Sequence, residues 1–266
     1  MRTIDKVLQL LENNKEEFVS GQEMAKTHGI SRNAIWKAIR ELRNKGYIID
    51  AVSNRGYRLS KNTDIVSSAG IFSHLDPGTA ERCAGIEVHD SVDSTSDLAK
   101  ELAIKGAGHG MTVISAKQTL GRGRRDHKFF SPEGGLYMSI VLKPEEIRFK
   151  DPDELTGFIG RSVIEAISDL TGQKPEIRGV NDLYIKDKKI CGILIESGSE
   201  FDTGHLQWIV AGIGINFDSD ISLFPDDIKK RSASLYKPGR AGITKNLLAA
   251  KIIENILRQD KALKEK

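Results

Sequence analysis

The stretch Gln118-Thr119-Leu120-Gly121-Arg122-Gly123-Arg124-Arg125 places two glycines and three arginines in five consecutive positions, shortly after a glutamine. Glycine lets backbone amides approach a ligand closely, and arginine presents a planar fork of donors that matches a carboxylate or a phosphate. Predicted strands flank the stretch at residues 111–116 and 136–142. The pattern therefore predicts a loop that closes over an anionic ligand.

This loop does not match two common phosphate-binding motifs. It lacks the G-x-x-x-x-G-K-[ST] pattern of a P-loop, and G-R-G-R-R-D does not complete G-x-G-x-x-G. On composition alone, an exposed basic loop or a nucleic-acid contact is the alternative, because runs of charge are usually solvated.

The chain has 266 residues, enough for one large domain or two smaller ones. No apolar segment follows Met1, and no apolar run is long enough to cross a bilayer, so we expect neither a signal peptide nor a membrane partner. The two cysteines, Cys83 and Cys191, are far apart and lack metal-ligand spacing. We therefore expect a cytoplasmic protein without cysteine-bound metal.

The positive charge is concentrated at the N-terminus. Residues 1–60 hold 11 Lys/Arg and 7 Asp/Glu, a balance of +4, whereas the remainder holds 29 and 30, a balance of −1. This distribution is expected if the N-terminal part meets nucleic acid.

A helix-turn-helix pattern occupies the same region. Residues 3–14 carry apolar side chains at helical spacing. Ser20 can cap a helix over Gly21–His28, and Ser31 can cap another over residues 32–45, with a short turn containing glycine between them. A predicted hairpin, residues 47–52 and 57–59, completes a winged helix, which we place at residues 1–62.

The outer face of the third helix and the hairpin tip predict a surface that binds DNA in its major groove. The candidate DNA-binding residues are Arg32, Asn33, Trp36, Lys37, Arg40 and Arg55. Arg43 also falls outside the apolar stripe of the third helix, and Arg58 lies close to the hairpin tip. The alternative is a small helical domain with a solvated face, in which Trp36 packs against the wing.

Beyond residues 62–66, predicted strands and helices alternate without a strict βαβ rhythm. Ser94 or Thr95 can cap a helix that runs through Ala103, and a long helix is predicted over residues 153–170. Residues 185–195 predict a hairpin with its turn at Asp187-Lys188, and the strand at 207–217 has interior glycines that indicate close backbone approach.

Five motifs in order identify a resemblance. They are DSTS at 93–96, Q-x-x-GRGRR at 118–125, FFSPEGGLYMS at 129–139, NDLYIKDKKICGILIE at 181–196 and GIGIN at 212–216. Following a winged helix, they resemble the biotin–protein ligases, in particular the bifunctional ligase/biotin-operon repressors, over nearly the whole chain. The resemblance implies an α+β fold, in which a mixed-sheet catalytic domain of the class II aminoacyl-tRNA synthetase/biotin ligase type occupies residues 66–266.

The resemblance also implies chemistry and partners. Such enzymes use biotin, ATP and Mg²⁺ to form biotinyl-5′-AMP, and they then transfer biotin to a lysine of a biotin carboxyl carrier protein domain. The repressor members bind operator DNA as a homodimer when biotinyl-AMP is bound.

Site residues are implied by position in the motifs. The expected catalytic residues are Lys189, Arg124 and Asp182; the expected biotin contacts are Ser94, Thr95, Ser96, Gln118, Arg122, Gly123, Arg124 and Lys189; the expected ATP or adenylate contacts are Arg122, Arg124, Asn181, Lys189 and Asn216.

Two departures from the family pattern leave other functions open. Arg178-Gly179-Val180-Asn181-Asp182 stands where the family usually reads Lys-Trp-Pro-Asn-Asp. We also expect the family's C-terminal SH3-like domain to be absent after the helical stretch at 244–264. These departures favour, as an alternative, a DNA-binding sensor of biotin or biotinyl-AMP with weak or no transfer. A lipoate ligase relative is a third possibility, against which the winged helix and the GRGRR loop argue.

Overall fold

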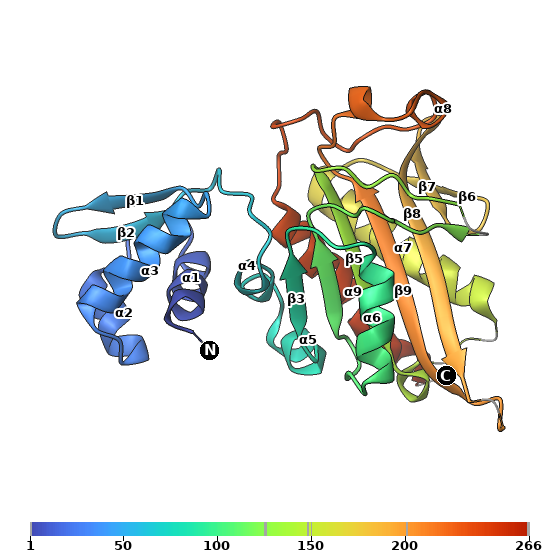
Figure 1. The fold of residues 1–266 in the computed structure, drawn as a ribbon, viewed down its shortest axis with the longest axis horizontal. Helices are drawn as coiled ribbons and strands as arrows, with labels where there is room; N and C mark the ends of the chain where they lie inside the picture. The colour runs from blue at the N-terminus through green and yellow to red at the C-terminus, as the bar shows by residue number, and fades with distance from the viewer. Residues whose placement is uncertain (1, 125–126, 148, 150, 201, 265–266) are drawn as a thin grey trace. The chain divides into compact units, whose positions relative to one another are not determined.

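The computed structural model describes residues 2–124, 127–147, 149, 151–200 and 202–264. Contacts divide the chain into two units (Figure 1). Unit 1 comprises residues 1–74 and 244–247, and unit 2 comprises residues 75–243 and 248–266. Every helix in the described part of the chain is too short or too polar to cross a membrane.

Unit 1 contains the predicted helix-turn-helix. Its helices are α1 (Thr3–Asn13), α2 (Gly21–His28), α3 (Arg32–Asn44) and the short α4 (Ser68–Phe72). Ser20 Oγ accepts a hydrogen bond from Glu23 N at 3.0 Å, and Ser31 Oγ accepts one from Ala34 N at 3.2 Å. These are the two predicted N-caps, which satisfy amides that the first helical turn leaves free.

The wing is an antiparallel hairpin of β1 (Ile49–Val52) and β2 (Gly56–Leu59). The first strand is shorter than predicted, because Tyr47 lies before the first paired residue. The second strand is longer than predicted, because Gly56 pairs with Val52. Gly56 has a φ of 104° and lies against the Val19 backbone, where any side chain would overlap it.

The core of unit 1 is apolar. It is formed by Ile4, Val7, Leu8, Leu11, Val19, Met24, Ile35, Ala38, Ile39, Leu42, Tyr47, Ile49 and Leu59.

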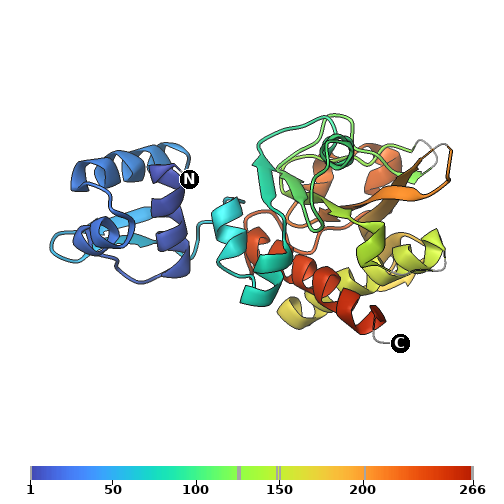
Figure 2. The ribbon, with the colours of Figure 1, turned by 90° about the horizontal axis from the view of Figure 1, so that it is seen from below.

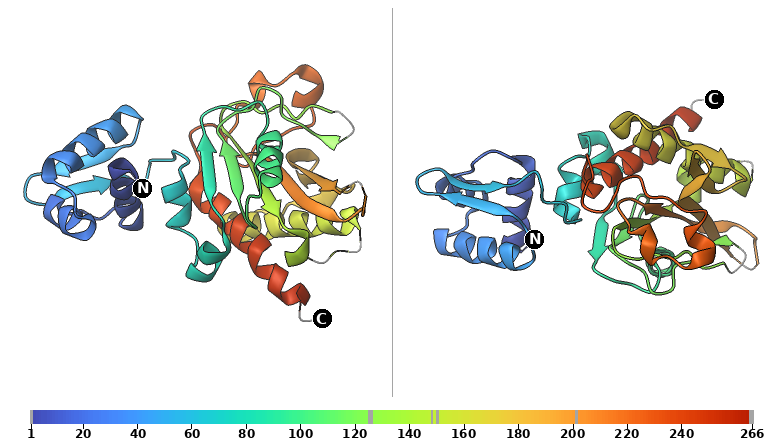
Figure 3. Two further views of the ribbon diagram at one scale, coloured as in Figure 1. Left: turned by 60° about the horizontal axis from the view of Figure 1, so that its bottom comes forward. Right: turned by 90° about the horizontal axis from the view of Figure 1, so that it is seen from above.

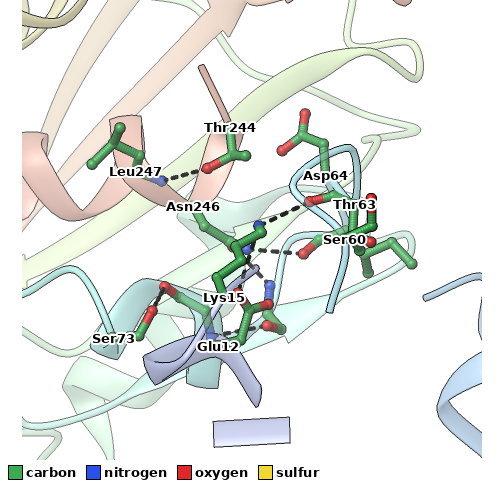
Figure 4. Close-up of polar contacts among 12 residues, drawn as sticks. Glu12, Lys15, Ser60, Thr63, Asp64, Ser73, Thr244, Asn246 and Leu247 are labelled. Atoms are coloured by element: carbon green, nitrogen blue, oxygen red, sulfur yellow. Dashed lines mark hydrogen bonds and ion pairs between the residues drawn. The ribbon is translucent and has the colours of Figure 1, made fainter. Parts of the chain in front are cut away.

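A buried polar cluster joins α1, the segment after the wing and residues 244–247 within unit 1 (Figure 4). Lys15 Nζ donates to the Thr63 carbonyl at 3.1 Å and lies 3.7 Å from the carboxylate of Glu12. Burial raises the pKa of Glu12, and the nearby Lys15 opposes that effect. Asn246 is fully buried.

Unit 2 is built on a seven-stranded mixed sheet in the order β3-β4-β5-β9-β8-β7-β6. Its strands are β3 (Ile86–His89), β4 (Thr112–Ser115), β5 (Gly135–Leu142), β6 (Glu176–Arg178), β7 (Asp182–Ile185), β8 (Lys188–Ser199) and β9 (Leu206–Asn216). The pair β3–β4 is parallel, and the other neighbours are antiparallel. The predicted mixed sheet is thus confirmed.

Helices cover both faces of this sheet (Figures 1 and 2). Helix α6 (Thr95–Ile104) packs on one face, and α7 (Pro152–Thr171) and the unit 2 part of α9 (Lys245–Lys264) pack on the other. Asn255 Nδ2 on α9 donates to the Ser162 carbonyl of α7 at 3.0 Å, and the helices adjoin in Figure 3. The short elements α5 (Pro77–Arg82), η2 (Pro144–Glu146), η3 (Ile221–Leu223) and α8 (Asp226–Lys229) were not predicted.

The hairpin between β7 and β8 corrects one prediction. Its turn is Lys186-Asp187, not Asp187-Lys188, because Ile185 already pairs with Lys188. Lys186 takes the left-handed conformation, with a φ of 55°, that closes such a tight connection.

The polar cluster of unit 1 depends on Asn246. Its Oδ1 accepts from Ser67 N at 3.0 Å, and its Nδ2 donates to the Ile65 carbonyl at 3.0 Å. Asn246→Ala should leave both backbone groups unpaired, which should lower the free energy of unfolding of unit 1 by roughly 1–3 kcal/mol for each group.

Fluorescence of Trp36 in a Trp208→Phe background measures this effect. Trp36 lies in unit 1 and is then the only tryptophan of the chain, so its signal follows urea unfolding of unit 1. The exposed control Asn62→Ala should not shift the transition, and an equal shift in both variants would contradict the prediction.

Candidate active site

A network of hydroxyl and amide groups lies at the N-terminus of α6. Gln118 Oε1 accepts from Thr95 N at 2.8 Å and from Thr95 Oγ1 at 3.1 Å. Ser139 Oγ lies 2.8 Å from Thr95 Oγ1 and 3.1 Å from Ser96 Oγ. Gln118 Nε2 donates to Ser131 Oγ at 2.9 Å. These five residues, the hydroxyl network, come from α6, β5 and the segments before β5, so only the tertiary structure assembles them.

Ser94 has a different position from its neighbours. Its buried hydroxyl caps α6 by accepting from Asp97 N at 3.3 Å. The structure thus identifies Ser94, rather than Thr95, as the N-cap residue.

Glycines on two central strands make room above the sheet. Gly192 on β8 pairs with Gly214 on β9. A Cβ on Gly214 would lie 2.6 Å from Phe129 Cε1, and one on Gly192 would lie 3.0 Å from Phe129 Cε2. A Cβ on Gly212 would lie 2.6 Å from Ser96 Oγ. The interior glycines therefore mark close approach, as the sequence predicted.

The arginine-rich loop folds back on itself at the rim of this space. Gly123 N donates to the His127 carbonyl at 2.7 Å. Arg122 Nε donates to Asp97 Oδ2 at 2.8 Å, whereas Arg124 Nη2 stands 3.8 Å from an Asp153 oxygen. Arg125, the third arginine of the motif, lies outside the described residues.

A lysine–aspartate pair lies across the space from the hydroxyl network. Lys189 Nζ is 2.7 Å from Asp182 Oδ1 and 5.6 Å from the centroid of the Phe129 ring. About a quarter of each charged side chain is exposed, so the pair is reachable from solvent. Lys188 is exposed and bonds instead to the Lys230 carbonyl.

Two asparagines complete this wall. Asn181 Nδ2 donates to the Ile193 carbonyl at 3.0 Å, and Asn216 Nδ2 donates to the Ala233 carbonyl at 3.1 Å. Asn216 Oδ1 is buried and finds no hydrogen-bond partner among the described residues. A buried acceptor of this kind is available to a ligand donor.

These groups enclose one cavity of about 470 Å³. Ten of the eleven predicted site residues line it: Thr95, Ser96, Gln118, Arg122, Gly123, Arg124, Asn181, Asp182, Lys189 and Asn216. The eleventh, Ser94, is not among the lining residues. The cavity thus combines a neutral polar network with a cationic rim, which suits a ligand with both an amide-like and an anionic end.

Other lining residues were not predicted. Tyr184 follows Asp182 by two positions on β7, so strand alternation could have revealed it. Asp227 and Arg231 belong to the segment after β9, and Arg231 reaches the cavity because its carbonyl accepts from Lys189 N at 2.8 Å. No sequence motif indicated that the segment after β9 lies beside the cavity.

The unusual Arg178-Gly179 segment does not line the cavity itself, but Arg178 contacts the lining residue Tyr184. Arg178 donates to Asp187 Oδ1 at 3.0 Å and to the Lys186 carbonyl at 2.7 Å, and its guanidinium lies 5.1 Å from the Tyr184 ring centroid. Gly179 has a φ of 67°, a conformation that favours glycine.

In unit 1, the predicted DNA-facing side chains of α3 are exposed. They are Arg32, Asn33, Trp36, Lys37 and Arg40. Trp36 is 50% exposed, and the Arg40 guanidinium lies 4.8 Å from its ring centroid. Trp36 therefore contributes to the basic surface of the helix.

The wing holds its exposed arginine on an aromatic ring. Arg55 and Arg58 lie 4.4 and 4.6 Å from the centroid of Phe18, which the sequence analysis missed. Arg58 is also bound to Asp50 at 2.8 Å, and Arg43 donates to the Ile49 carbonyl at 3.0 Å. These last two arginines hold the hairpin.

Comparisons with known proteins agree with both units. Residues 3–58 match the HTH domain family, and residues 88–216 match the biotin/lipoate A/B protein ligase family. The bifunctional ligase/repressor BirA of Bacillus subtilis is 36% identical over 91% of this chain and 75% of that protein. The Escherichia coli protein of the same description is 31% identical over 94% of this chain and 74% of that protein.

Solved structures show the same catalytic fold. A biotin protein ligase from Aquifex aeolicus in complex with biotin and ATP superposes with a TM-score of 0.57 and 31% identity, over 68% of this chain and 72% of that chain. Fold and cavity thus define a protein with a helix-turn-helix domain and a biotin-ligase-type domain. Within that class, this chain belongs to the bifunctional ligase/repressor family.

The glycine pair beneath Phe129 gives a test of the cavity. Gly214→Ala should destabilise unit 2, because the new Cβ would lie only 2.6 Å from the Phe129 ring. The expected cost is about 1–3 kcal/mol in the free energy of unfolding. Gly157→Ala on α7 is a matched control, since its Cβ meets only the tip of Arg161 at 3.3 Å. Because alanine favours a helix more than glycine does, this change should raise the free energy of unfolding by up to about 1 kcal/mol. The thermal unfolding midpoint should fall in Gly214→Ala and rise in Gly157→Ala. Shifts in the same direction would contradict the prediction.

Proposed function

We propose that this chain activates biotin with ATP, transfers it to a lysine of a biotin carboxyl carrier domain, and represses transcription in response to biotin. The observation that carries the proposal is the arrangement of the cavity, with the hydroxyl network at one side, the Lys189–Asp182 pair at the other and two arginines at the rim. The family membership supports both halves of the function.

The first step joins two anions. A carboxylate oxygen of biotin attacks the α-phosphorus of ATP, and pyrophosphate leaves as biotinyl-5′-AMP forms. Lys189 and the rim arginines supply fixed positive charge for this encounter, and fixed charge is most effective where water is excluded. The uncharged donors and acceptors of the hydroxyl network suit the neutral ring system of biotin.

The second step consumes the mixed anhydride. The neutral amine of the carrier lysine attacks the acyl carbon, the C–O bond to phosphate breaks, AMP leaves and the amine loses a proton. Asp182 offers a carboxylate at the cavity wall that can orient the incoming amine. The described parts of the loop, residues 120–124 and 127–128, then act as a cover that keeps water from the anhydride.

Mg²⁺ accompanies ATP in this proposal. Within the described part of the chain, no group of three or more His, Cys, Asp or Glu residues is arranged to hold a metal ion. The cavity does contain two carboxylates, Asp182 and Asp227. This fits Mg²⁺, which commonly binds through one or two carboxylates together with substrate phosphates, and which would neutralise phosphate charge there.

The sensor alternative predicts a different product pattern. Arg178 is engaged by Asp187 and Lys186 and does not itself line the cavity, and this feature motivates the alternative. Incubation with ATP, labelled biotin and a carrier domain separates the functions. Label on the carrier supports the ligase, and adenylate without transfer supports the sensor. In a parallel incubation with labelled lipoate in place of biotin, transfer of lipoate but not of biotin would overturn both.

Lys189 and Lys188 provide a matched pair for adenylation. Lys189→Ala should abolish most biotinyl-AMP formation, because its ammonium lies beside Asp182 in the cavity. Lys188→Ala should be mild, since that side chain is exposed and bonds to a backbone carbonyl. Biotin-dependent exchange of pyrophosphate into ATP measures this step. Equal losses in the two variants would show that the assignment of Lys189 is wrong.

DNA binding should depend on the ligand through dimerisation. The +4 balance of residues 1–60 is too small for one winged helix to bind tightly at physiological salt, so two copies on a two-fold operator should be needed. We expect sedimentation to show a monomer without biotinyl-AMP and a dimer with it. Gel shifts should show that only the dimer binds operator DNA.

Variants of α3 separate the two activities. Lys37→Ala and Arg40→Ala should weaken operator binding without changing adenylation, because both side chains are exposed in unit 1. A ligand-free monomer that binds the operator as well as the ligand-bound protein would rule out the proposed coupling.

A further inference from the structure

Four side chains of alternating charge form a continuous chain of contacts from the arginine loop to strand β8. Arg122 Nε donates to Asp97 Oδ2 at 2.8 Å, and Asp97 Oδ1 lies 2.7 Å from Lys100 Nζ. Lys100 Nζ in turn donates to Glu196 Oε1 at 2.8 Å. We call these residues the Asp97 relay. It connects the loop, the first turns of α6 and the middle of β8.

The inner part of the relay is well anchored. The Lys100 and Glu196 side chains are 19% and 24% exposed, so solvent screens them less than an ordinary surface pair. Burial by itself would raise the pKa of Asp97, but the hydrogen bonds from Lys100 and Arg122 hold that pKa below its usual value. Asp97 N is also bonded to the Ser94 cap. The carboxylate is therefore held in place both through its backbone and through its two oxygens.

The contact leaves most of the Arg122 guanidinium available. Asp97 accepts from Nε, and no hydrogen bond from the terminal Nη groups is found among the described residues. Arg122 also lines the candidate active site. Since guanidinium binds carboxylate or phosphate through paired donors, the Nη groups can meet a ligand anion while Nε stays on Asp97.

The two described arginines of the loop differ in how firmly a carboxylate holds them. Arg124 has a loose partner, an Asp153 oxygen at 3.8 Å. Arg122 has a 2.8 Å bond to a carboxylate that is itself held by Lys100. Of the two arginines that the structure describes in this loop, Arg122 is thus anchored and Arg124 is loosely held.

We propose that Asp97, supported by Lys100 and Glu196, is a positioning residue that fixes Arg122 for the anionic part of biotinyl-AMP. This inference rests on the proposed function. A pre-positioned guanidinium loses less side-chain freedom when the ligand binds. More of the favourable energy of its contact therefore remains to slow the dissociation of biotinyl-AMP. Asp97 acts through Arg122 and need not touch the ligand.

The test is a double-mutant cycle in the full chain. Asp97→Asn keeps the shape of the side chain and removes its charge. We expect it to speed dissociation of biotinyl-AMP, measured by stopped-flow competition, about tenfold, and Arg122→Ala should do so at least as strongly. In Arg122→Ala, the further change Asp97→Asn should have no additional effect. Asp97→Glu, which restores the charge, should recover part of the retention.

Glu101→Gln is the matched control on the same helix. Glu101 forms an exposed pair with Lys105 at 3.9 Å and should leave dissociation unchanged. Unchanged or slower dissociation in Asp97→Asn, or effects of Asp97→Asn and Arg122→Ala that simply add, would overturn the positioning role. If the wild-type chain neither forms nor retains biotinyl-AMP, the proposed function itself fails, and this inference fails with it.

Discussion

The site depends on the absence of side chains at the centre of the sheet. Gly192 on β8 pairs with Gly214 on β9, and Phe129 lies close to both. A methyl group at Gly214 would overlap the Phe129 ring, and one at Gly192 would lie tightly against it. Gly212 has the same relation to Ser96. Because these positions are bare, the hydroxyl network and Lys189 can border one cavity instead of being separated by packed side chains.

Charge then divides the cavity into two chemical environments. The hydroxyl network is neutral and mutually hydrogen-bonded, whereas Lys189, Arg122 and Arg124 are paired with carboxylates from three different elements. Such pairing keeps cations in a partly buried place without leaving them unsatisfied. It also means that a ligand anion meets positive charge whose orientation is already set, most firmly at Arg122.

In unit 1, some basic side chains are exposed and others are bound within the fold, and the exposed ones form the proposed DNA-binding surface. Arg32, Lys37 and Arg40 project from α3 and are exposed. Arg43 and Arg58 are also basic residues of the helix and the wing, but neither is free for DNA. Arg43 binds the Ile49 carbonyl and Arg58 binds Asp50, so both stabilise the wing. The polar cluster around Asn246 shows further that residues far apart in the chain complete this unit.

Local sequence determined the features that depend on local physics. The caps at Ser20 and Ser31 and the glycine-bounded helices follow from backbone hydrogen bonding, and the ordered motifs identified the family and ten of the residues that line the cavity. Tertiary structure decided what depends on long-range contacts. It places Arg231 beside Lys189, joins Asp97 to Glu196 through Lys100, and brings Asn246 to Ser67. Periodicity carries no information about such pairs, because the partners lie on separate elements and meet only when the chain packs.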